Sequence, residues 1–217
     1  AQAYFAGTMK PAEGHVLKPG QPVLGAPVLT VGPGTGFGQA LFVPGANPQV
    51  IATEGGHRLI PVRTERELRL CQTLTQDEGH PAILEYALSG RGICRLYDAV
   101  LRENGAAPDP CDPPAVTQAA LAGPGPAREA IVWFIELLAV AAADACVMTG
   151  ARGGVAISGG ITPRLVPLFD DLEFTGHFAR PGILHDYLEQ VPVTLVTNPY
   201  AALYGAATLM RSHLGIR

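Results

Sequence analysis

Short apolar runs separated by glycine and proline dominate the first quarter of the chain. The runs at 27–31, 37–43 and 50–53 are rich in β-branched and aromatic residues, and turn-forming residues separate them. This spacing predicts two or three consecutive antiparallel strands. Residues 8–27 show little periodicity, so we expect an ordered connector there, with a short extended piece at Val23 and Leu24.

From residue 63 the pattern changes to helical spacing. Apolar positions recur with a helical period over 63–79, 81–88 and 93–103, and a shorter helix is expected at 115–122. The longest helical segment is 126–148, which Gly150 closes. Its apolar residues are nearly continuous, but Arg128, Glu129, Glu136 and Asp144 fall inside it. Because a membrane span needs about 20 apolar residues without such interruptions, a helix buried in the core is the better interpretation.

The last third of the chain alternates strands and helices. We expect strands at 154–157 and 191–196, helical pieces over 163–169 and 173–189, and a terminal helix that opens at 198 with Pro199 in its first turn. Residues 1–7 have the pattern of an amphipathic helix that Gly7 ends. Consecutive strands, then helices, then strand–helix alternation predict a mixed α/β layer structure.

Composition narrows the classes of function. The 217 residues carry a net charge of −4 and are 47% hydrophobic, which fits one large domain, or one domain plus part of another. This net charge does not favour binding to nucleic acid or to an anionic membrane. The first residues lack the basic flank and apolar run of a signal peptide.

Four scattered cysteines show no zinc-ligand spacing. They form either buried free thiols or one disulfide. We favour free thiols because a chain of this length buries a core that needs no covalent staple, and this indicates a reducing, cytoplasmic setting. The four are Cys71, Cys94, Cys111 and Cys146.

A glycine-dense turn, Val31-Gly-Pro-Gly-Thr-Gly-Phe-Gly38, joins the first two predicted strands. It lacks the Gly-Lys-Ser/Thr and the following helix of a P-loop, and it lacks the helix of a dinucleotide-binding fingerprint. Two interpretations stay open. The turn is an empty tight hairpin, or its backbone N–H groups and the Thr35 hydroxyl bind a phosphate.

Polar residues follow at the ends of other predicted elements. Glu54 and His57, separated by two glycines, are suited to binding sugar hydroxyls, to capping, or, with a third ligand that the sequence does not show, to metal binding. Glu85 lies on a predicted helix and by itself fits a solvated face. Ser158-Gly159-Gly160 follows a strand and precedes a helix, where glycines let a flat ring approach the backbone.

Five motifs in this order resemble bacterial glucokinases of the non-ROK branch, in the hexokinase and actin-like ATPase superfamily. They are Gly-Pro-Gly-Thr-Gly-Phe-Gly, Glu-Gly-Gly-His, Glu-Tyr-Ala-Leu-Ser-Gly-Arg-Gly, Ile-Ser-Gly-Gly-Ile-Thr-Pro-Arg and Asn-Pro-Tyr-Ala-Ala-Leu-Tyr-Gly-Ala-Ala. The resemblance implies an actin-like ATPase or ribonuclease H-like domain, with a mixed central sheet covered by helices on both faces. It also implies transfer of the γ-phosphate of ATP, with Mg²⁺, to the 6-hydroxyl of glucose.

The same resemblance assigns roles to residues. Glu54, His57 and Glu85 would bind the sugar; Gly34, Thr35 and Gly36 would face the phosphates; Gly159 and Gly160 would line the adenosine pocket. No residue of the chain is expected to hold a metal by itself. A homodimer is left open, since family members often form dimers.

One departure from the family pattern is serious. The family's small domain supplies an Asp-x-Gly-Gly-Thr phosphate loop and an Asn-Asp pair whose Asp is the general base, and neither occurs here. We therefore expect 1–10 to be the end of a small-domain helix, 11–198 to be the large domain, and 199–217 to return to the small domain, with the base just upstream of Ala1. The alternative is a non-catalytic sugar-binding or regulatory module on the same fold. An actin-like assembly protein gains no support from the Glu-Gly-Gly-His cluster.

Overall fold

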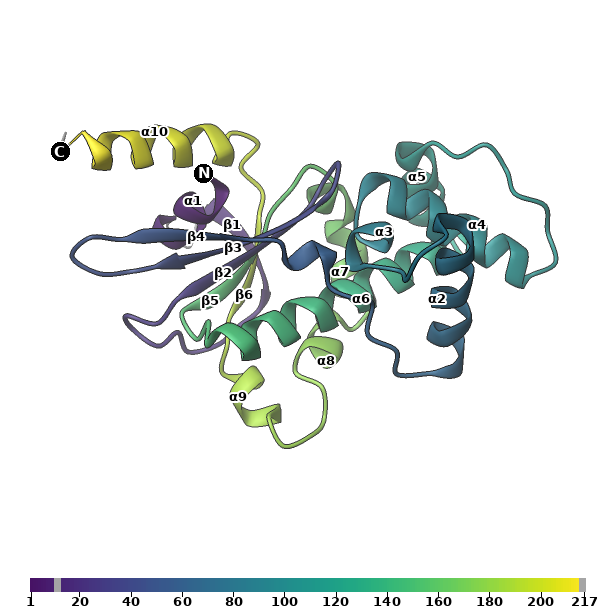
Figure 1. Cartoon of the computed structure of the whole chain (residues 1–217), viewed down its shortest axis with the longest axis horizontal. Helices are drawn as coiled ribbons and strands as arrows, with labels where there is room; N and C mark the ends of the chain where they lie inside the picture. The colour runs from purple at the N-terminus through teal and green to yellow at the C-terminus, as the bar shows by residue number, and fades with distance from the viewer. Residues whose placement is uncertain (10–12, 215–217) are drawn as a thin grey trace.

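A mixed sheet of six strands forms the centre of the computed structural model, which describes residues 1–9 and 13–214 (Figure 1). Strand β3 pairs antiparallel with both β2 and β4. Strand β5 pairs parallel with both β2 and β6, and β1 pairs antiparallel with β6. The spatial order is β1-β6-β5-β2-β3-β4. The strands span β1 (Gly14–Lys18), β2 (Val28–Pro33), β3 (Phe37–Val43), β4 (Gln49–Thr53), β5 (Gly154–Ile157) and β6 (Val193–Val196).

Helices cover both faces of the sheet, as the resemblance implies. Helices α1 and α10 lie side by side on one face, whereas the long helix α6 crosses the other face with α8 beneath it (Figure 1). A group of helices from α2 to α5 extends beyond one end of the strands and packs on α6. The helices are α1 (Gln2–Thr8), α2 (Glu65–Glu78), α3 (Leu84–Ala87), α4 (Gly90–Glu103), α5 (Pro113–Ala122), α6 (Pro126–Thr149), α7 (Val166–Asp171), α8 (Phe174–Phe178), α9 (His185–Glu189) and α10 (Ala201–His213), with 3-10 turns η2 (Gly55–His57) and η3 (Thr162–Leu165).

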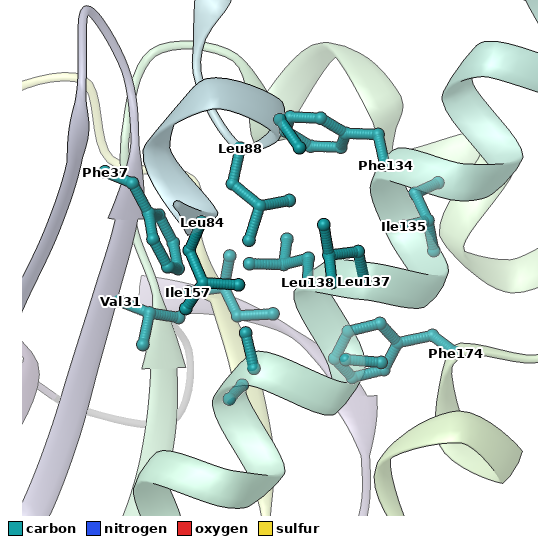
Figure 2. Packing of buried hydrophobic residues seen from close by; sticks show 14 of the residues in the cluster. Val31, Phe37, Leu84, Leu88, Phe134, Ile135, Leu137, Leu138, Ile157 and Phe174 are labelled. Atoms are coloured by element: carbon teal, nitrogen blue, oxygen red, sulfur yellow. The ribbon is translucent and has the colours of Figure 1, made fainter. Parts of the chain in front are cut away.

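The alternation of side chains along each strand separates two cores. On the α6 side, Val31 of β2 and Ile157 of β5 are fully buried, and Figure 2 shows them beside Leu84 of α3 and Leu138 of α6. Successive strand residues point to opposite faces, so the neighbouring Ala156 packs instead with Phe5 of α1. Burial of each large apolar side chain stabilises the folded state by about 1.5–3 kcal/mol relative to leaving that side chain exposed. This large core fixes the strand ends that carry the glycine turn.

Most of the predicted elements are confirmed. The three consecutive antiparallel strands form, and β3 and β5 have the predicted bounds. Helix α6 is the described helix that is long and apolar enough to cross a membrane, and 67% of its most apolar window is buried inside the protein. The prediction of a helix buried in the core is therefore confirmed by its packing.

The predicted connector over 8–27 is wrong in one respect, because it contains the edge strand β1. This strand pairs with β6, near the other end of the chain, so no local sequence pattern indicates it. The expected extended piece at Val23 and Leu24 does not form, and Leu24 lies in a fully exposed turn. Residues 10–12 of this connector, like 215–217 of the terminal helix, lie outside the described residues.

Three helix boundaries also differ from the prediction. The helix expected at 81–88 is the single turn α3, because Ile83 is extended and bridges Leu59. Gly7 does not end α1 but lies within it, where a Cβ would be 2.1 Å from the Phe42 ring. Helix α10 begins at Ala201, after a turn in which Asn198 Oδ1 accepts a hydrogen bond from Tyr200 N–H.

The prediction of four free thiols is wrong for one pair. Cys94 of α4 and Cys111, just before α5, form a disulfide, whereas Cys71 and Cys146 are free. The core needs no disulfide for its stability, but the path of the chain after α4 brings two cysteines 17 positions apart within bonding distance.

Candidate functional site

The turn between β2 and β3 is built from backbone. Gly34 N–H donates to the Gly36 carbonyl over 2.8 Å, which closes the turn, and the Gly34 carbonyl accepts from Gly90 N–H at the start of α4, also over 2.8 Å. Thr35 is exposed at the tip. Within the described chain, the N–H groups of Thr35 and Gly36 donate to no acceptor, and a Cβ on Gly34 would meet only open space. Free N–H groups in a turn without bulky side chains are suited to an anion such as phosphate.

Glu85 of α3 supports the other side of this turn. Its Oε2 accepts a hydrogen bond of 2.8 Å from Phe37 N–H, the first backbone amide of β3. A Cβ on Gly36 would lie 2.5 Å from the same oxygen, so only glycine lets the carboxylate approach. The solvated-face interpretation of Glu85 is therefore wrong, since the side chain is half-buried and bonded. Its second oxygen, Oε1, has no hydrogen-bond partner within the described chain and is available to a ligand.

The Glu54–His57 segment is the 3-10 turn η2, which lies against the start of β3. A Cβ on Gly56 would lie 2.1 Å from the Phe37 carbonyl oxygen, so this position also needs glycine. The His57 imidazole Nδ1 and the Glu54 carboxylate Oε2 are 3.4 Å apart, with their side chains 60% and 90% exposed. Two polar groups are thus held together at the surface, where a ligand can reach both.

The backbone of one residue, Phe37, brings these segments together. The N–H of Phe37 binds Glu85 and its carbonyl lies against Gly56, so the two predicted sugar-binding segments meet at the first residue after the glycine turn. The Phe37 ring is buried in the core, which fixes the position of the Phe37 backbone. The structure therefore brings Glu54, His57 and Glu85 to the same strand end as the turn.

The segment Ser158-Gly159-Gly160 lies beside the turn, at the end of β5. Ser158 N–H donates to the Val31 carbonyl over 2.8 Å, and Gly159 has φ 124° with its Cα against the Pro33 carbonyl. Gly160 is exposed. The chain leaves β2 toward β3 but leaves β5 toward β6, on the other side of the sheet. Ligands of open α/β sheets bind at such points, where neighbouring parallel strands continue in opposite directions.

Supporting residues near η2 were not predicted. Thr53 Oγ1 donates to the Gln39 carbonyl over 3.1 Å and accepts from Gly55 N–H over 3.3 Å, while the Gln39 side chain packs on Gly55. Arg58 Nη2 donates to the Ala141 carbonyl of α6 over 3.2 Å. These contacts fix η2 to the sheet and to the core helix. Only the two glycines of the motif hinted that something packs closely there.

The described residues contain no group of three or more His, Cys, Asp or Glu side chains that is placed to hold a metal ion. The backbone donors at Thr35 and Gly36 fit the phosphates of a nucleotide, and the open backbone at Gly160 fits a flat ring. The arrangement is suited to an anion and a hydroxyl-bearing ligand side by side.

A ribonuclease H-like mixed sheet with glycine turns at the ends of its central parallel strands defines a domain of the actin-like ATPase fold. The family model described as "Glucokinase" matches residues 1–213. The chain belongs to the glucokinase family.

Curated relatives agree with this assignment. The chain is 36% identical over 194 residues to a protein named "Glucokinase" from Paramagnetospirillum magneticum, covering 88% of this chain and 60% of the relative. It is 38% identical over 200 residues to one from Chromobacterium violaceum, covering 91% of this chain and 57% of the relative. The chain therefore spans less than two thirds of the relatives that it matches.

Solved structures show the same fold. The crystal structure of a glucokinase from an Antarctic psychrotroph matches with a TM-score of 0.89 and 34% identity, covering 97% of this chain and 66% of that one. A more distant match in fold is a ROK-family glucokinase from Streptomyces griseus, solved with glucose and AMPPNP, with a TM-score of 0.58 and 19% identity over 86% of this chain and 61% of that one. The expected fold class is confirmed.

Proposed function

We propose that this chain is the sugar- and adenosine-binding half of a cytoplasmic glucokinase, which transfers the γ-phosphate of ATP to the 6-hydroxyl of glucose. The observation that carries the proposal is that the Glu54–His57 and Glu85 segments meet at the backbone of Phe37, directly beside a turn with free N–H groups. Membership of the glucokinase family supports it.

Each group has a role that its geometry allows. Glu54, His57 and Glu85 Oε1 bind sugar hydroxyls, because carboxylates and imidazole make directional hydrogen bonds that orient the ring. The N–H groups of Thr35 and Gly36 bind nucleotide phosphates. Gly159 and Gly160 admit the adenosine next to β5. Phosphoryl transfer depends mainly on positioning and on charge stabilisation, which these groups supply.

The general base is assigned outside residues 1–217. Among the described carboxylates at the site, Glu85 is tied to a backbone N–H and Glu54 faces His57, so both are placed to bind rather than to take the proton of the reacting hydroxyl. Magnesium would bind with the nucleotide, since the described residues offer it no ligand cluster.

We also propose that α1 and α10 connect to a second, smaller domain, with boundaries at residues 1–10 and 199–217. The outer side of α10 supports this proposal, because several of its large side chains are exposed where a surface helix usually carries polar ones. A covering domain would shield this apolar surface. The exposed residues on α10 are Leu203, Tyr204 and Met210, and Tyr200 and Leu214 flank the helix.

Calorimetric titration of the purified 217-residue chain with glucose tests the sugar site. We expect glucose to bind, and the variants Glu54→Gln and Glu85→Gln each to weaken binding about tenfold or more, because hydrogen bonds to charged groups contribute about 1.5–3 kcal/mol. Glu65→Gln removes an exposed carboxylate of α2 and is the matched control. Binding of neither glucose nor ATP by the wild-type chain would contradict the proposal.

A coupled assay for ADP release tests whether the general base lies outside residues 1–217. General acid–base catalysis is worth roughly 10²–10⁴-fold, so the chain alone should turn over negligibly. Glucose-dependent ADP release by residues 1–217 would show that the base is within the chain. Tight glucose binding without any nucleotide binding would instead favour the non-catalytic sugar-binding module.

A further inference from the structure

The segment between α4 and α5 is attached to the protein by very little besides one disulfide. Its residues from Asn104 to Pro110 are exposed, and residues 107–111 make no hydrogen bond within the described chain. Two backbone bonds, from Gly105 and Ala106 to the last turn of α4, secure its beginning. The bond between Cys94 and Cys111 secures its end, immediately before the first turn of α5.

This disulfide is open to exchange, whereas the free cysteines are not. Cys94 and Cys111 are both partly exposed, and the segment that precedes Cys111 is exposed. Burial raises the pKa of Cys146 to about 12 and that of Cys71 to about 11, so both stay protonated and unreactive near neutral pH. Thiol chemistry is therefore concentrated at one pair out of the four cysteines.

A partly buried carboxylate lies near the disulfide on α4. Asp98 lies one turn after Cys94 on α4, and its Oδ1 is buried without a hydrogen-bond partner in the described chain. Burial is the main cause that raises the pKa of Asp98; Arg102 lowers this pKa, and Asp77 and Asp109, which is two residues before Cys111, each raise it to a smaller extent.

We propose that Cys94 and Cys111 form a reversible redox modification site that clamps residues 104–112 onto α4 when oxidised and frees them when reduced. The oxidant is a small-molecule disulfide such as oxidised glutathione. One cysteine thiolate attacks it and expels a small thiolate, which leaves a mixed disulfide. The second cysteine thiolate then attacks the protein sulfur and expels the second small thiolate. Two electrons pass to the small disulfide, and the two cysteine protons go to the expelled thiolates.

The clamp has structural consequences at both of its ends. Helix α4 begins at Gly90, whose N–H holds the carbonyl of the glycine turn, and α5 packs on α4 and α6. This inference depends on the cysteines alone and holds whether or not the proposed sugar kinase activity does.

Redox titration of the wild-type chain, followed by hydrogen exchange, tests the proposal. The protein is equilibrated with graded ratios of reduced to oxidised glutathione, alkylated and analysed by peptide mass. Cys94 and Cys111 should convert together within this range, while Cys71 and Cys146 stay thiols. A pair that stays bonded in a large excess of reduced glutathione is a permanent staple and would overturn the proposal, as would a pair that never forms.

Exchange measurements then compare the two states. On reduction, protection of the Ala106 and Val116 amides should fall about tenfold, since both flank the clamp, while protection of Val155 in β5 stays constant. Cys111→Ser should match the reduced wild type under oxidising conditions, and Cys71→Ser should behave as wild type. If Cys111→Ser fails to fold, the wild-type comparison still decides. Equal exchange in both states would overturn the proposal.

Discussion

The strand-end site and the core around α6 obtain their geometry in opposite ways. At the site, four glycines lie where an added Cβ would be 2.0–2.5 Å from another atom. In the core, side chains such as Phe134, Ile135 and Leu138 are 0% exposed and fill the space between α6, the sheet and the neighbouring helices. The site is shaped by the absence of side chains, and the core by their volume. The four glycines are Gly36, Gly55, Gly56 and Gly159.

This difference predicts different tolerance to substitution. Cores accept swaps that conserve volume at a cost below about 1.5 kcal/mol, because neighbouring side chains adjust. A backbone carbonyl pressed against a glycine cannot adjust in this way without moving the strand that carries it. We therefore expect core changes to alter global stability and glycine changes at the site to alter binding first.

The largest expected effect comes from emptying the core. Leu138→Ala should lower the free energy of unfolding by about 2–5 kcal/mol, because it removes transfer energy and leaves a cavity beside α6. Urea denaturation monitored by circular dichroism measures it. The matched control is Leu68→Ala on α2, where the same side chain is 46% exposed, and a similar loss there would contradict the comparison.

Filling the site should have a smaller effect on stability and a larger one on binding. Gly56→Ala places a Cβ against the Phe37 carbonyl, so η2 must move, at a cost of about 1–3 kcal/mol. Glucose affinity should fall at least about tenfold in calorimetry because Glu54 and His57 move with the turn. Gly45→Ala, in the β3–β4 turn where a Cβ meets nothing within 4 Å, is the control. Unchanged affinity in Gly56→Ala would break the comparison.

The sequence predicted the core better than the site, for a physical reason. Elements that contribute to the core have a periodic pattern of apolar residues, so the predicted bounds of β3, β5 and α6 are close to the observed ones. Strand β1 was missed because its partner β6 lies far along the chain. Whether β1 joins the sheet depends on tertiary contacts and not on its local sequence.

The site was predicted through its motifs, not through its contacts. Glycine density marked the turn, yet the turn alone also fitted an empty hairpin. Nothing local showed that Glu85 binds Phe37 N–H, since 48 residues separate them. The roles of Gln39, Thr53 and Arg58 as supports depend on packing between elements, which no sequence pattern recorded. Likewise, the Cys94–Cys111 bond depends on the path of an exposed segment.

A helix cap that lies outside both the strand-end site and the core around α6 should have a smaller effect on stability. Thr64 accepts a hydrogen bond from Glu67 N–H, and Glu67 accepts one from Thr64 N–H, so the two residues form a capping box at the start of α2. Thr64→Ala should cost about 1 kcal/mol of stability and leave glucose affinity unchanged, since α2 is not part of the site. Thr175→Ala, at an exposed position of α8, should cost less. A loss of sugar binding in Thr64→Ala would show that the helical layer is coupled to the site.

The smallest expected effect is a pH slope at Lys18, which tests how the core side of the sheet accommodates charge. Lys18 is 2% exposed; its Nζ donates to the carbonyls of Pro19 and Val191 over 3.1 and 3.3 Å and lies 3.7 Å from Glu189 Oε2. Burial lowers the pKa of Lys18 below 10.5, and Glu189 offsets only part of this shift.

The sign of the slope follows from proton binding. Between the lowered pKa of the folded state and the ordinary pKa near 10.5, the unfolded chain binds more protons at Lys18 than the folded chain does. Stability contributed by this group therefore rises with pH through that window and is constant well below it. Urea denaturation of wild type and Lys18→Met at several pH values up to about 10.5 measures the difference between them. This difference should move in favour of wild type as pH rises, whatever its value at neutral pH. A difference that stays constant, or that moves the other way, would show that the carbonyl cage and Glu189 compensate the burial of the charge in full.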